Sequence, residues 1–147
     1  MSALIKNINF EDMQFAINDP KKSLIINTLD AHQQGCLIAG TLNIEQEVEV
    51  LNAHLKKNID VRIIIYGMNA TDKTCLKKYE QLIKLGFYNV YIYIGGLFEW
   101  LLLQDIYGTE LFPTTATKVD LLKLSQATII NPDIKIHPEK IRDFKIL

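Results

Sequence analysis

At 147 residues, the chain is long enough for one compact domain. Hydrophobic residues make up 48% of it and charged residues 22%, a globular balance that excludes a disordered chain. Its 16 basic and 17 acidic residues nearly cancel, so we expect no nucleic-acid-binding surface. No apolar run approaches the roughly 20 residues of a membrane span, and two cysteines do not make a disulfide framework or a zinc site. We expect a soluble cytoplasmic protein with no metal or other cofactor.

Short apolar runs alternate with helical patterns along the chain, which predicts a mostly parallel sheet covered by helices. Residues 11–18 have the spacing of a short helix, and residues 24–26 are typical of a short buried strand. Residues 45–57 predict a helix that faces the core with Val48, Leu51 and Leu55, because these lie at positions i, i+3 and i+7.

The clearest strand lies at the centre of the sequence. Residues 61–66 are mostly β-branched with almost no polar interruption, which is typical of a strand buried on both faces. Residues 89–94 predict a second strand of the same kind, and residues 97–107 predict a helix that is apolar on most sides.

Between these strands lie a polar loop, residues 67–73, and a predicted helix over residues 72–85. Thr71 is the expected N-cap residue of this helix, and Gly86 suits the left-handed position after its last turn. The helix should turn Cys75 toward the core, where a cysteine behaves as a small apolar residue.

A loop that leaves a parallel strand and enters a helix gathers backbone N–H groups, so it can bind an anion or stabilise a thiolate. The segment 67–74 matches the phosphate-binding pattern G-x-x-x-x-G-K-[ST] except at Asp72, which replaces the second glycine. A carboxylate there would face an anionic phosphate, which disfavours nucleotide binding.

Several short segments, taken together, resemble the rhodanese family over residues 8–107. The matching segments are 63–66, Gly86-Phe87, Asn89-Val90-Tyr91, Gly95-Gly96-Leu-Phe-Glu-Trp100 and, upstream, residues 35–44. The resemblance implies an α/β fold: a three-layer domain with a central, mostly parallel five-stranded sheet and helices on both faces. Because the sequence pattern weakens from Thr109 onward, we predict a rhodanese-like domain over residues 1–112 and a C-terminal extension, residues 113–147, that packs on the domain or binds a partner.

The sequence departs from the family at the residues that carry its chemistry. The resemblance places Gly67 where the family has its nucleophilic cysteine, and glycine has no side chain that could accept sulfur. The family's loop arginine is missing as well, because the chain's only arginines are Arg62 and Arg142, which also excludes the related tyrosine phosphatases. The family's early Asp-x-Arg pattern is replaced around Asn27. We therefore predict no catalytic residue.

The candidate site is the loop itself, as a surface for an anion or a partner. Its residues are Gly67, Met68, Asn69, Ala70, Thr71, Asp72, Lys73 and Thr74, and Cys75 is the alternative nucleophile.

Three hypotheses for function follow. The favoured one is a catalytically inactive rhodanese-like module that binds or regulates another protein, through loop N–H groups that cradle an acidic group or through the apolar segment 131–147. The second is residual sulfur transfer through Cys75, or phosphoryl transfer through residues 72–74. The third is a subunit of a larger assembly such as a virion, because residues 104–115 are similar to rhodanese-like proteins of large DNA viruses. The expected partner is a protein or a second copy of the chain, not nucleic acid or a membrane.

Overall fold

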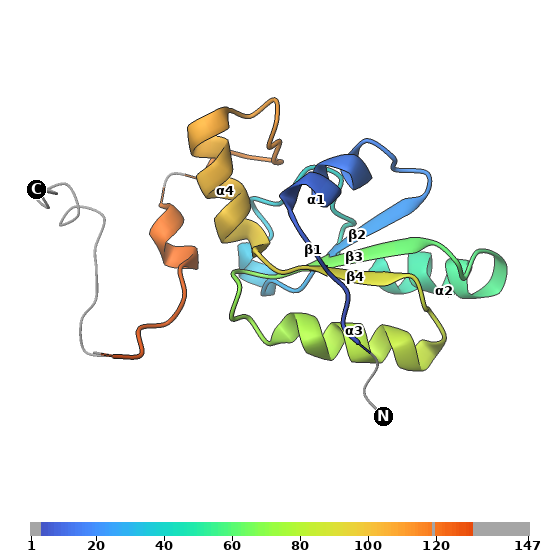
Figure 1. Ribbon diagram of the computed structural model, residues 1–147. Helices are drawn as coiled ribbons and strands as arrows, with labels where there is room; N and C mark the ends of the chain where they lie inside the picture. Colours follow the sequence, from blue (N-terminus) through green and yellow to red (C-terminus); the bar gives the residue numbers. More distant parts are fainter. Residues whose placement is uncertain (1–3, 119, 131–147) are drawn as a thin grey trace, which may run out of the picture.

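The computed structural model describes residues 4–118 and 120–130, and its centre is a parallel sheet of four strands in the order β1-β4-β3-β2 (Figure 1). The strands are β1 (Asn7–Ile8), β2 (Ser23–Asn27), β3 (Arg62–Tyr66) and β4 (Val90–Tyr93). In the register of the sheet, Ile63 of β3 lies opposite Leu24 on one side and Val90 on the other.

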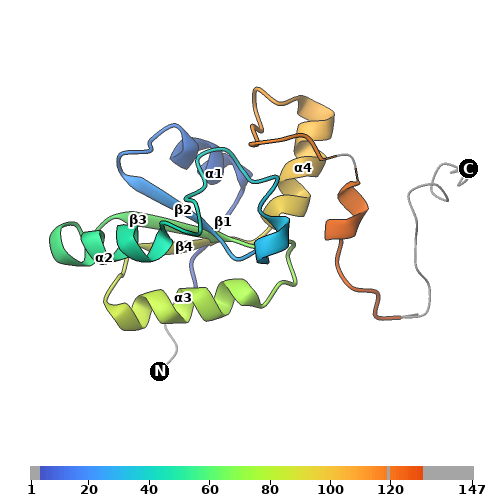
Figure 2. The same ribbon diagram turned by 180° about the vertical axis from the view of Figure 1, so that it is seen from behind.

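Helices cover both faces of this sheet (Figures 1 and 2). Side chains of α1 (Phe10–Ile17) and α4 (Gly96–Tyr107) pack on one face, and those of α2 (Glu47–Lys57) and α3 (Thr74–Leu85) on the other. Two short 3-10 helices, η1 (Ala31–Gln33) and η2 (Leu121–Leu124), complete the fold. The predicted α/β class with a parallel sheet between helical layers is confirmed.

Strand β3 contributes side chains to the apolar cores on both faces of the sheet, because successive side chains of a strand point to opposite faces. Ile63 and Ile65 pack beneath α2 and α3, whereas Ile64 and Tyr66 pack beneath α1 and α4. The fully buried hydroxyl of Tyr66 accepts the N–H of Ile38 at 3.1 Å. The prediction of a strand buried on both faces is therefore confirmed.

The sheet has four strands, so the expectation of five strands from the resemblance is wrong. Residues 38–44 meet β2 at a single bridge between Thr41 and Ile25, where the N–H of Leu42 donates to the Ile25 carbonyl at 2.7 Å. Gly40, with a φ of +87°, turns the chain just before this bridge. The Asn43 side chain then accepts the N–H of Glu45 at 2.9 Å, so the ladder ends before a strand can form.

Helix α2 is rotated from its predicted orientation. Leu51 is buried and Leu55 packs against the same core, but Val48 is 70% exposed, so the prediction that it faces inward is wrong. Glu47 takes the inward direction instead, because its carboxylate pairs with the ammonium group of Lys78 on α3 at 3.2 Å.

The described part of the C-terminal extension contacts the domain. Thr114 forms an antiparallel bridge with Ile38, and the indole N–H of Trp100 donates to the Pro113 carbonyl at 3.1 Å. Leu124 of η2 is 2% exposed and belongs to the core under α4. The apolar segment 131–147 lies outside the described residues. Among those described, no helix has the length and apolar character to cross a membrane.

Replacing Leu124 with alanine should therefore weaken the whole fold and not only the extension. We expect the free energy of unfolding to fall by about 2–5 kcal/mol, because the change leaves a cavity in the core. Leu111→Ala is the control: this leucine is 56% exposed, and its loss should change stability by less than about 0.5 kcal/mol. Equal shifts of the urea midpoint in the two variants would contradict the core position of η2.

Candidate functional site

The loop between β3 and α3, residues 67–73, is hydrogen-bonded to the first turn of α4. The N–H groups of Leu97 and Phe98 donate to the carbonyls of Gly67 and Met68, each at 2.9 Å. Gly96 has a φ of +69°, and a Cβ there would lie 2.8 Å from the Gly67 carbonyl oxygen. Only glycine permits this close approach. Gly96 therefore lets the start of α4 lie directly against the loop.

The carboxylate of Asp72 folds back onto its own loop. One oxygen accepts the N–H of Met68 at 2.9 Å, and the other accepts the N–H and the hydroxyl of Thr74 at 3.0 and 2.6 Å. Partial burial opposes ionisation, but these hydrogen bonds outweigh it and hold the pKa of Asp72 below its ordinary value of 3.8. The anion bound by these donors thus comes from the protein itself.

Asn69 organises the rest of the loop. Its side-chain oxygen accepts both the N–H and the hydroxyl of Thr71 at 3.0 Å, and its amide donates to the Leu124 carbonyl at 2.9 Å. Helix α3 begins at Thr74 with Lys73 as its N-cap residue. The prediction that Thr71 caps this helix is therefore wrong, because Asn69 binds its hydroxyl.

Gly67, the first residue after β3, is closely surrounded by polar side chains. A Cβ built on it would lie 2.5 Å from Asp72 Oδ2 and 2.9 Å from both Cys75 Sγ and Thr28 Oγ1. No side chain fits at position 67 unless these neighbours move.

Cys75 lies in the first turn of α3 and is 6% exposed. Burial raises the pKa of its thiol to about 11; the weak contact with Thr28 Oγ1 at 3.6 Å lowers it, and the nearby Asp72 charge raises it further. The thiol is therefore protonated at neutral pH. The expectation that Cys75 faces the core agrees with its packing beside Tyr79 and Leu82.

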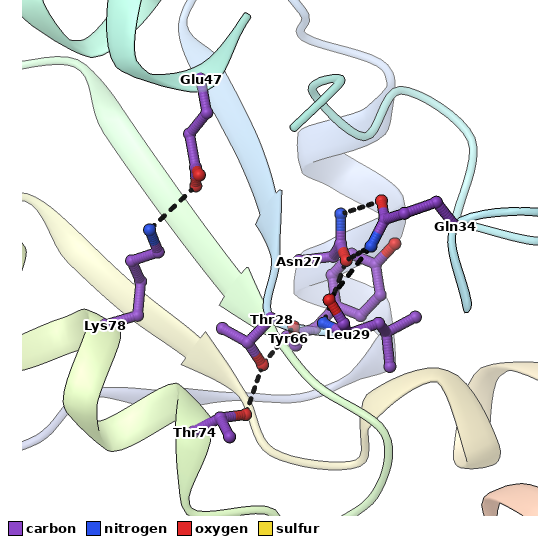
Figure 3. Close-up of polar contacts among 8 residues, drawn as sticks. All are labelled: Asn27, Thr28, Leu29, Gln34, Glu47, Tyr66, Thr74 and Lys78. Atoms are coloured by element: carbon purple, nitrogen blue, oxygen red, sulfur yellow. Dashed lines mark hydrogen bonds and ion pairs between the residues drawn. The ribbon is translucent and has the colours of Figure 1, made fainter. Parts of the chain in front are cut away.

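Two polar groups at the end of β2 complete the site, and sequence reasoning did not assign either of them a role. Asn27 and Gln34 exchange amide hydrogen bonds at 2.8 and 3.1 Å, and the Asn27 oxygen also accepts the N–H of Leu29 (Figure 3). The Thr28 hydroxyl lies 2.7 Å from the Thr74 hydroxyl and so joins β2 to α3. Asn27 is 3% exposed, and a polar residue closing a buried strand is a sequence signal for such a network. Thr28 gives no comparable signal.

A hollow of about 380 Å³ opens beside the loop, between the segment after β2 and the C-terminal extension. Among residues 4–118 and 120–130, its charged lining residues are Asp30 and Asp72, and none of its lining residues is basic. Its other lining residues are Thr28, Leu29, Gln33, Met68, Asn69, Thr71, Thr74, Ser125 and Ala127. Of the predicted site residues, Gly67, Ala70, Lys73 and Cys75 do not line it. No group of three His, Cys, Asp or Glu side chains that could hold a metal occurs within residues 4–118 and 120–130.

Adding a methyl group at Gly67 should destabilise the protein by about 1–3 kcal/mol, since the new Cβ collides with Asp72. Combining Gly67→Ala with Asp72→Ala should cost less than the sum of the single changes, because the second change removes the carboxylate from that space. Chemical denaturation of all four proteins measures this coupling. Gly35→Ala, where a Cβ meets nothing within 4 Å, is the control; strict additivity of the first pair would contradict the close contact.

The contribution of Asp72 to stability should depend on pH. Because its folded-state pKa is depressed, the stabilisation is fully present above the ordinary value of 3.8 and is lost as the pH falls through the folded-state pKa. Asp72→Asn should therefore lower the melting temperature at pH 7, and the difference from the parent protein should shrink under more acidic conditions. A difference that stays constant with pH would show that Asp72 acts through shape alone.

Comparison with solved structures finds the same fold in proteins of low sequence identity. A rhodanese-like domain from Anabaena sp., determined by NMR, is 17% identical, with a TM-score of 0.54 over 91% of this chain and 97% of its own. The single-domain sulfurtransferase RDL2 of Saccharomyces cerevisiae is 19% identical, with a TM-score of 0.54 over 77% of this chain and 99% of its own. A thiosulfate sulfurtransferase of Pseudomonas aeruginosa matches 67% of this chain with 19% of its own, at 16% identity and a TM-score of 0.53. At these identities the likeness shows the fold alone.

Comparison with curated proteins found no significant match. The family model for the rhodanese-like domain matches residues 12–103, which extend from α1 to the third turn of α4 and include the whole β3–α3 loop. Because this match covers more than half of the chain, the chain belongs to the rhodanese-like domain family.

Proposed function

We propose that this chain is a catalytically inactive rhodanese-like domain that binds another protein at the hollow beside the β3–α3 loop. One observation carries the proposal: the Asp72 carboxylate fills the space that a side chain at Gly67 would need. The two cysteines of the chain are both buried, Cys36 at 8% exposure and Cys75 at 6%.

The electrostatics of the hollow also argue against sulfur transfer. Thiosulfate is a dianion, and in the hollow it would meet the carboxylates of Asp30 and Asp72, with no basic side chain from the described part of the chain to offset them. A thiol with a pKa of about 11, such as that of Cys75, holds too little thiolate at neutral pH to be an effective nucleophile.

A second candidate, residual sulfur transfer through Cys75, has one observation in its favour. The Cys75 sulfur lies 2.9 Å from the Cβ position built on Gly67, so it is close to where a nucleophile at position 67 would begin. Two of the proteins with a similar fold are sulfurtransferases, which also supports this candidate.

Incubation of the purified chain with thiosulfate and cyanide separates the two candidates. We expect no thiocyanate above the rate of a protein-free control and no mass increase of one sulfur atom on either cysteine. Cys75→Ser and Cys36→Ser are the matched variants. Thiocyanate production that Cys75→Ser abolishes and Cys36→Ser leaves intact would replace the binding role with the catalytic one.

A further inference from the structure

The hollow beside the loop lies next to a second one. This second hollow, of about 520 Å³, shares Thr28, Leu29 and Thr74 with the first and lies between α2 and α3. We call the two together the docking groove. Figure 3 shows its middle, where Thr28 and Thr74 meet, and the Glu47–Lys78 pair further along. Two adjacent hollows of this kind suit an extended chain better than a single small ion.

The two ends of the docking groove carry opposite charge. The charged lining residues of the first hollow are Asp30 and Asp72, and Asp72 is bound by its own loop. The charged lining residues of the second are Lys77, Lys78 and Glu47. Because Lys78 pairs with Glu47 at 3.2 Å, Lys77 leaves this end basic, and Lys77 forms no ion pair within the described part of the chain. Asp30 and Lys77 are therefore the opposite charges available to a partner.

Apolar side chains lie between and beside these charges. Leu29 lines both hollows at 8% exposure, and Ile44, 36% exposed, lines the basic end. An apolar side chain of a ligand would gain free energy mainly by removing the exposed surface of Ile44 from water, because Leu29 is already almost fully buried. Flanking charges would set the direction and register of the bound chain.

We propose that the docking groove binds an extended segment of a partner protein in which a basic residue faces Asp30, an acidic residue faces Lys77, and an apolar residue between them covers Leu29 and Ile44. This inference rests on the proposed binding function and specifies the chemistry of the partner.

Selection from a phage-displayed library of random dodecapeptides on the immobilised full chain tests it. We expect the enriched peptides to carry one basic and one acidic residue on either side of an apolar one. For a synthetic peptide of the enriched sequence, Asp30→Lys and Lys77→Glu should each raise the Kd by about tenfold or more, because each places like charges together. The doubly reversed protein should instead prefer a peptide with its two charges exchanged.

Lys56→Glu, on exposed α2 surface outside the groove, is the matched control and should bind like the parent protein. Asp30→Asn, which removes the charge at nearly constant shape, replaces Asp30→Lys if circular dichroism shows that the lysine variant does not fold. No enrichment, or a Kd indifferent to both charge changes, would overturn the inference. If the protein shows no sulfur transfer, either of these results leaves its proposed catalytic inactivity unaffected. Cyanide-dependent turnover of thiosulfate would instead contradict the proposed function itself.

Discussion

The hydrogen bond between the Met68 N–H and the Asp72 carboxylate is the contact on which the rest of the site depends. With that anion inside the loop, the N–H groups of Met68 and Thr74 already have an acceptor, and position 67 has no space for a side chain unless its neighbours move. Burial is the main reason why the pKa of the Cys75 thiol is raised; the Asp72 charge raises it further and also adds to the acidic character of the hollow. One residue thus links the shape, the charge and the thiol chemistry of the site.

Segments far apart in the sequence hold this loop in place. The start of α4 binds the carbonyls of Gly67 and Met68, the Thr28 hydroxyl meets Thr74 at the start of α3, and Asn69 donates to η2 in the extension. The loop therefore behaves as part of the packed domain and not as a free connection, because its backbone and side chains are bound on three sides. Rigid positioning of this kind is what a binding surface needs to discriminate between partners.

Local patterns predicted those features of the fold that depend on local chemistry. The β-branched run of β3, the inward direction of Cys75 and the left-handed Gly86 after α3, with a φ of +116°, all follow from residue type and spacing. Val48 was misplaced because apolar spacing takes no account of the Glu47–Lys78 pair that turns α2. The hydroxyl contact between Thr28 and Thr74 joins residues 46 positions apart, and no pattern within either segment predicts it. From the sequence, Asp72 was expected to disfavour phosphate binding at the loop. In the fold, its own carboxylate is the anion that the loop N–H groups bind.

The crowding around Gly67 also has an evolutionary consequence. A cysteine introduced at position 67 by a change in one codon would place its Cβ against the Asp72 carboxylate, so this single variant should be less stable than the present sequence. Losing the carboxylate first would instead leave the Met68 N–H without its acceptor. Neither order of substitution is free of a stability cost, so the residues at positions 67 and 72 restrict which substitutions each of them can accept.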